Sequence, residues 1–109
     1  MKIRADIATC ENERDTILSM CQLGPEGIER EVIIQRGPRE FEVIEEDPGP
    51  KISCEELGLD LVRGPEKITF SGNVMTIVLS DSGNIEVDIS NLPRDEQEEL
   101  KVVGKVLFR

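Results

Sequence analysis

The chain has 109 residues, of which 38% are hydrophobic and 33% are charged, and its formal net charge is -10 at pH 7. The length predicts a single domain over residues 1–109 with one modest core, and the hydrophobic content excludes a disordered chain. The three Phe residues occur without any Trp or Tyr, so we expect an aliphatic core and little binding by aromatic stacking.

Charge and hydropathy also narrow the expected partners. Lys and Arg are scattered along the sequence, which disfavours a nucleic-acid partner because phosphate neutralisation dominates that kind of binding. No run approaches the roughly 20 apolar residues of a membrane-spanning helix, and Met1-Lys2 leads directly into an alternating stretch instead of a signal peptide. We therefore expect a cytoplasmic protein with no membrane partner.

The chain begins with an alternating pattern over residues 2–9, in which Ile3, Ala5 and Ile7 share one face. This predicts a half-buried strand. Thr9 is then expected to cap a helix that ends near Leu23. The apolar stripe of that helix would consist of Ile17, Leu18, Met20 and Cys21.

Two strands are predicted next, over residues 31–36 and 40–45, with Phe41 and Val43 facing inward. Residues 37–39 would connect them as a hairpin. A second helix is predicted from Cys54 to about Val62, because Ser53 and Glu56 form a capping box. Its weakness is that the leucines at positions 57, 59 and 61 also fit the period of a strand.

The stretch from Lys67 to Ser90 predicts a three-stranded meander with turns at two Ser-Gly-Asn sequences. A two-residue loop at Gly72-Asn73 would pair Phe70 with Met75 and Ile68 with Ile77. A three-residue loop over 81–83, with Gly83 in the left-handed conformation, would pair the following residues so that all the apolar side chains stay on one face. The expected pairs are Leu79 with Ile85, Ile77 with Val87 and Met75 with Ile89.

A third helix is predicted after Asn91-Leu92-Pro93, since acidic residues crowd its start and lysines its end. The valine-rich segment from Val102 onward would also fit a seventh strand. The expected fold is therefore α+β, with a mostly antiparallel sheet of about six strands and three helices. Its first six elements have the βαββαβ order of the ferredoxin-like arrangement, followed by the rest of the meander and the C-terminal helix.

The three cysteines, Cys10, Cys21 and Cys54, have no CxxC spacing. On one predicted helix, Cys10 and Cys21 would lie roughly 16 Å apart, too far for a disulfide. We expect three free thiols that fill small spaces in the core. The functional alternative is a reactive or metal-bound thiol.

Catalytic constellations are missing from the sequence. Without His, neither nucleophile pairs of the Ser-His type nor His-based zinc sites can form within one chain. GxGxxG, P-loop and GxSxG motifs are also lacking. We therefore expect that the protein is not an enzyme and carries no organic cofactor.

Two functional hypotheses remain. The first is an interaction or regulatory module of a protein complex, or a self-associating protein, whose half-apolar outer face consists of Val74, Thr76 and Val78. The second is weak binding of Ca²⁺ or Mg²⁺ by the oxygen ligands around one turn, Asp81, Asn84, Glu86 and Asp88. The acidic runs 45–47 and 95–99 are expected to be solvated surface.

Overall fold

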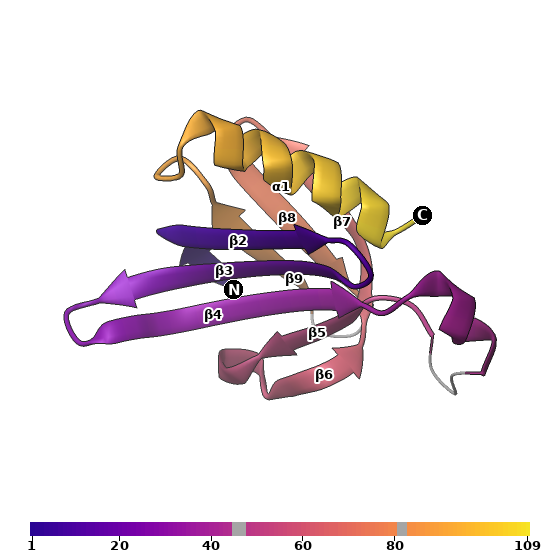
Figure 1. Cartoon of the computed structure of the whole chain (residues 1–109). Coiled ribbons are helices and arrows are strands. Elements are labelled where there is room, and N and C mark those ends of the chain that lie inside the picture. Colours follow the sequence, from indigo (N-terminus) through magenta and orange to yellow (C-terminus); the bar gives the residue numbers. More distant parts are fainter. Residues whose placement is uncertain (45–47, 81–82) are drawn as a thin grey trace.

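The computed structural model describes residues 1–44, 48–80 and 83–109. Their strands form two sheets, which pack against each other with one α-helix along one side (Figure 1). The five-stranded sheet has the order β2-β3-β4-β5-β6, and the four-stranded sheet has the order β1-β9-β8-β7. Neighbouring strands are antiparallel except β1 and β9, which are parallel.

The elements have the following bounds. The five-stranded sheet consists of β2 (Ile7–Asn12), β3 (Thr16–Gly24), β4 (Gly27–Arg36), β5 (Lys51–Cys54) and β6 (Leu59–Arg63). The four-stranded sheet consists of β1 (Lys2–Arg4), β7 (Pro65–Ser71), β8 (Val74–Leu79) and β9 (Asn84–Asp88). The helices are α1 (Arg94–Leu107) and the short 3-10 helices η1 (Arg39–Ile44) and η2 (Glu55–Leu57).

The core lies between the two sheets and α1. The five-stranded sheet contributes alternate side chains such as Leu18, Met20 and Ile34, and the four-stranded sheet contributes Met75 and Ile77, all fully buried. The helix contacts β2 and β3 of one sheet and β7 of the other, so it closes the gap between the sheets on that side (Figure 1). The core is aliphatic, as its composition predicts.

The predicted first strand is divided between the two sheets. Ala5 donates its N–H to the carbonyl of Asp88 in one sheet, and Asp6 donates its N–H to the carbonyl of Cys21 in the other. The alternation therefore breaks between them: Ala5 is buried, whereas Ile7 is 47% exposed. The chain crosses from sheet to sheet at this corner.

The side chain of Asp6 holds the corner together. Its carboxylate accepts two hydrogen bonds from the Arg4 guanidinium, at 2.8 and 2.9 Å, one from the Leu23 N–H at 2.8 Å and one from the Asn91 amide at 3.1 Å. These donors, chiefly Arg4, hold the pKa of Asp6 well below its usual value of 3.8.

We expect Asp6→Asn to lower the free energy of unfolding at neutral pH. Because the pKa of Asp6 is lower in the folded state, its contribution is fully present above pH 3.8 and is lost as the pH falls below that value. Urea unfolding at several pH values should therefore show a shallower acid decline for Asp6→Asn than for the wild type. Asp15→Asn, in an exposed loop, is the control. Parallel acid profiles for Asp6→Asn and the wild type would contradict the assigned role.

The predicted ferredoxin-like fold class is wrong. The described chain has nine strands in two sheets instead of about six in one, and one α-helix instead of three. The helix predicted from Cys10 to Leu23 is instead the end of β2, a turn and β3, with Asn12 opposite Thr16. Leu18 and Met20 follow the period of a strand, and the polar run 13–15 makes the turn.

The second predicted helix is also wrong. The capping box does not form: the hydroxyl of Ser53 accepts a hydrogen bond from the Leu61 N–H at 2.9 Å across a β-bulge between β5 and β6. Only the single turn η2 is helical. Leu59 and Leu61 belong to strand β6, which agrees with their alternate spacing. Leu61 has φ 51, a conformation that costs a residue with a Cβ atom about 1–2 kcal/mol.

The strain at Leu61 predicts an unusual order of two variants. Leu61→Gly and Leu61→Ala both remove the side chain, but only Gly adopts positive φ without cost. We expect Leu61→Gly to be more stable than Leu61→Ala by about 1 kcal/mol in urea unfolding. The same pair of substitutions at Leu59 should give the opposite order, since Gly is disfavoured in ordinary strands. Equal stabilities at position 61 would refute the strained conformation.

The meander keeps its predicted faces, and its first hairpin also keeps the predicted register. Phe70 pairs with Met75 and Ile68 with Ile77 around the Gly72-Asn73 loop. However, Ile77 lies opposite Ile85 and Met75 opposite Val87, two residues away from the predicted pairs. A shift by two residues leaves every side chain on its face, so the apolar pattern could not distinguish the registers. Gly83 has φ 78, and residues 81–82 of the predicted loop lie outside the described residues.

The C-terminal segment is helical, which removes the alternative of a seventh strand in the valine-rich tail. The helix α1 begins after Pro93, with Asp95 and Glu96 in its first turn and Lys105 in its last. It buries Leu100, Val103, Gly104 and Leu107 against the sheets.

Candidate functional site

The most unusual surface of the protein is η1, which extends away from the sheets at one end of the molecule (Figure 1). The strand predicted over 40–45 is wrong, since residues 39–44 form this 3-10 helix. Its apolar side chains face solvent: Phe41 is 41% exposed, Val43 87% and Ile44 79%. We call these three residues the η1 surface.

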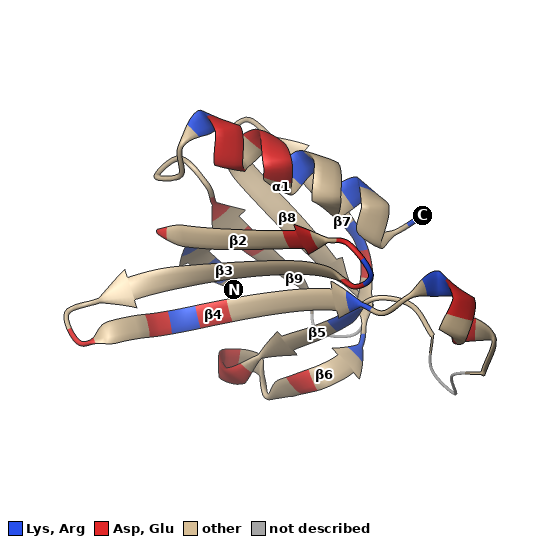
Figure 2. Cartoon of the chain, viewed as in Figure 1, with Lys and Arg blue, Asp and Glu red and all other residues tan. Residues whose placement is uncertain are grey.

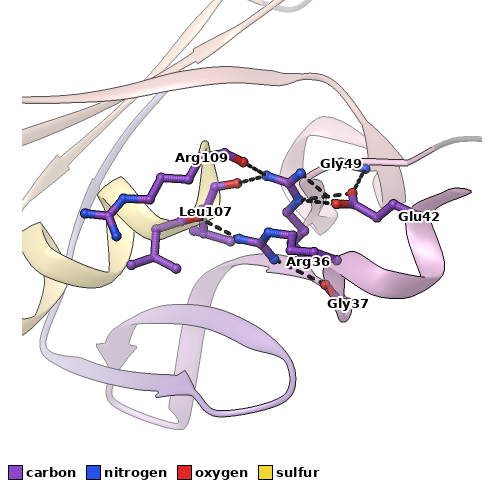
Figure 3. A network of polar contacts seen from close by, with 8 residues as sticks. Arg36, Gly37, Glu42, Gly49, Leu107 and Arg109 are labelled. Carbon is purple, nitrogen blue, oxygen red and sulfur yellow. Dashed lines mark hydrogen bonds and ion pairs between the residues drawn. The ribbon is translucent and has the colours of Figure 1, made fainter.

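The charged residue between them faces inward. Nε of Arg36 donates to both Glu42 carboxylate oxygens, at 3.2 and 3.0 Å, and Nη2 donates to Oε1 at 2.7 Å (Figure 3). The N–H of Gly49 donates to Oε2 at 2.7 Å. Both partners of the ion pair have side chains that are only 14% exposed. Arg36 holds the pKa of Glu42 below its usual value.

The normal polarity of a surface turn is therefore inverted over residues 42–44 of η1. A turn on a protein surface ordinarily buries its apolar side chains and exposes its charges. Here Glu42 is held against the body of the protein, while Val43 and Ile44 remain in water. The position of the turn is thus determined by charge-assisted hydrogen bonds instead of apolar burial.

The same network caps the C-terminal end of α1. Nη1 of Arg36 donates to the main-chain oxygens of Leu107 and Arg109, at 2.9 Å each (Figure 3). Nη2 of Arg39, on η1, donates to the carbonyl of Val106 at 2.6 Å. Carbonyls at a helix end lack partners within the helix, and a nearby cation also favours the helix dipole. The network therefore stabilises the last turn of α1.

Arginines that are scattered along the sequence gather at this end of the fold, where Figure 2 shows several blue segments beside the red ones of η1 and of the turn after β2. They line three adjacent open hollows of about 620, 500 and 410 Å³, which contain Arg14, Arg36, Arg39, Arg63 and Arg109. Arg36 and Arg39 are engaged with a carboxylate and with main-chain oxygens, and Arg14 lies over the Phe41 ring at 5.2 Å. This arrangement favours a structural role for these three cations over anion binding.

The predicted interaction residues lie on the outer face of β8. Val74 is 38% exposed, and Thr76 and Val78 are half-buried. The helix α1 packs on the other face of this sheet, where its Gly104 lies beside Phe70. The predicted residues thus face away from α1. On β9, Asp88 lies opposite Val74 and Glu86 opposite Thr76, so the apolar surface is only a narrow stripe.

The predicted cation ligands are spread along β9. One face of β9 carries Asn84, Glu86 and Asp88 at every second position, so the first and last are separated by about 13 Å. Glu86 lies 3.7 Å from the Lys2 ammonium group, and Asp88 accepts a hydrogen bond from the Ser90 N–H at 2.9 Å. Asp81 lies outside the described residues, as does the acidic run 45–47. Within the described ranges, no three acidic or cysteine side chains are close enough to hold a metal ion.

The cation hypothesis stays a prediction with a direct test. Titration with Ca²⁺ or Mg²⁺ to millimolar concentration, followed by amide NMR shifts, would show localised changes over residues 80–88 if the site exists. From the spacing of the described ligands along β9 we expect only weak, uniform shifts. A saturable change confined to this turn would establish the site.

All three cysteines are free thiols, as predicted. Cys10 is on the inner face of β2, where burial and then Glu99 and Glu96 raise its pKa to about 11. Burial also raises the pKa of Cys21 and Cys54. Thiolates are the nucleophilic form of cysteine, so these protonated thiols do not favour a reactive-cysteine function.

The η1 surface was not among the predicted sites. Its alternation of Glu with Phe, Val and Ile is typical of a strand, and that interpretation placed Phe41 and Val43 in the core. The Gly-Pro sequences at 37–38 and 49–50 were the available signal against a strand between them. Pro cannot donate a hydrogen bond to a neighbouring strand, so a strand enclosed by such sequences has few places to join a sheet.

No protein-family model matches the chain, and comparison with curated proteins gives no match. In the described parts of the chain, no helix combines the length and the apolar character that crossing a membrane requires.

Proposed function

We propose that the protein is an interaction module that binds a partner protein through the η1 surface, Phe41, Val43 and Ile44. One observation carries this proposal. Val43 is 87% and Ile44 79% exposed, while the acidic residue beside them is held inward by Arg36. Neighbouring exposed apolar side chains of this kind mark surfaces that other molecules cover.

The proposed partner presents an apolar recess. Burying one Val or Ile side chain fully is worth about 1.5–3 kcal/mol, so the two aliphatic side chains can anchor a small interface. A groove of about 410 Å³ continues from Val43 to Pro48 and Arg63 and offers a polar border. Such a small contact suits a transient complex better than a permanent one.

Other features support a binding function over catalysis. The chain has no His, and burial raises the pKa of each cysteine thiol. The net charge of -10 opposes the approach of a second copy, so we propose a different protein as the partner. Free thiols suit the reducing cytoplasm, which we propose as the location.

The proposal predicts the effect of a double substitution, Val43→Ser with Ile44→Ser. Immobilised wild-type protein should capture a partner from native cell extract. The double variant should capture at least about tenfold less of that partner, since both anchors are removed. Stability should change by no more than about 0.5 kcal/mol, because both side chains are exposed. Urea unfolding checks that expectation.

The matched control is Val102→Ser on α1, where the valine is 60% exposed. This variant should retain the partner. Equal capture by all three proteins would exclude the η1 surface as the binding site. Analytical ultracentrifugation of the purified wild type tests self-association: a dimer that the double variant dissolves would identify a second copy as the partner instead.

A further inference from the structure

We infer that Arg36 couples the η1 surface to the last turn of α1, so that a partner bound at η1 changes the order of the helix end. This inference rests on the proposed function for its biological meaning. The coupling itself is a property of the isolated protein. Arg36, which is not part of the η1 surface, thereby makes a regulatory contact.

The coupling arises because one guanidinium group serves two elements. Its Nε and Nη2 atoms bind the carboxylate of Glu42 in η1, and its Nη1 atom binds the main-chain oxygens of Leu107 and Arg109. A guanidinium group is planar and rigid, so its two edges cannot move independently. Displacement of η1 therefore displaces the donor that holds the helix end (Figure 3).

The surroundings make this contact strong enough to matter. The side chains of Arg36 and Glu42 are each only 14% exposed, so solvent screens the ion pair less than it screens a surface pair. A second link runs in parallel, from the Arg39 side chain of η1 to the carbonyl of Val106. Both links connect the same two elements.

Coupling between two sites is reciprocal. A partner that holds η1 in the conformation seen here would also protect the last turn of α1 from opening. Conversely, anything that draws the main-chain oxygens of Leu107 and Arg109 away from Arg36 would loosen η1 and weaken its binding. The end of α1 is thus a position from which docking at η1 can be regulated.

The test compares amide hydrogen exchange, measured by NMR on the whole chain without a partner, in wild type and in Glu42→Gln. Gln keeps the shape of the side chain but removes the charge that orients Arg36. We expect exchange to accelerate about threefold to tenfold at the Phe41 amide in η1 and, in parallel, at the amides of Val106 and Leu107. Within the described residues, Glu42 bonds to Arg36 and Gly49 and not to Val106 or Leu107, so acceleration at the helix reports the coupling.

Glu40→Gln is the matched control, because it removes the same charge from an exposed carboxylate of the same turn. It should leave both regions unchanged. Arg36→Lys, which keeps the charge but not the fork of donors, should reproduce the effect of Glu42→Gln. Acceleration at Phe41 with unchanged exchange at Val106 and Leu107 would overturn the inference.

These outcomes are independent of whether a partner binds η1. Loss of capture by the Val43→Ser and Ile44→Ser double variant tests docking, and exchange in Glu42→Gln tests coupling. If docking fails and coupling holds, Arg36 is a structural link alone and the regulatory meaning is refuted. If both hold, the partner should slow exchange at Val106 and Leu107 in the complex, and an unchanged rate there would also refute it.

Discussion

The fold depends on the corner at which the chain passes from one sheet to the other. At Asp6 a single carboxylate accepts hydrogen bonds from β1, from the end of β3 and from the segment that leads to α1. All three segments must reach this carboxylate in the folded protein, which fixes how the sheets meet. The inner faces of both sheets can then enclose one aliphatic core instead of two separate ones.

A comparable polar contact determines the surface at the other end of the molecule. Arg36 and Glu42 hold η1 in place without burying its aliphatic side chains. Charge-assisted bonds of this kind fix a geometry more specifically than apolar contact does. The protein can therefore present Val43 and Ile44 uncovered on a turn whose backbone is tethered through Glu42, which limits the backbone entropy that a partner must overcome on binding.

Local patterns in the sequence predicted correctly the features that depend on neighbouring residues. They failed where contacts with other elements determine the structure. The faces of the meander and the helix α1 follow from alternation and from capping chemistry. The β2–β3 hairpin was mistaken for a helix because Ile17, Met20 and Cys21 also fit a helical stripe. Nothing within the run from Glu40 to Ile44 signals that the Glu42 side chain faces inward. Its partner Arg36 lies on the preceding strand, and that arginine is itself held by main-chain oxygens at the end of α1.

The parallel pairing of β1 with β9 has a consequence for how the chain folds. Met1 donates from its amino group to the carbonyl of Asn84, 83 positions away, and Ile3 lies opposite Val87. During synthesis the first strand has no such neighbour until most of the chain has emerged. The hairpins of β2, β3 and β4 are local and can form early, so closure of the four-stranded sheet is a late step. Until that step, Ile3 and Ala5 stay exposed on a segment that still lacks its partner in the sheet.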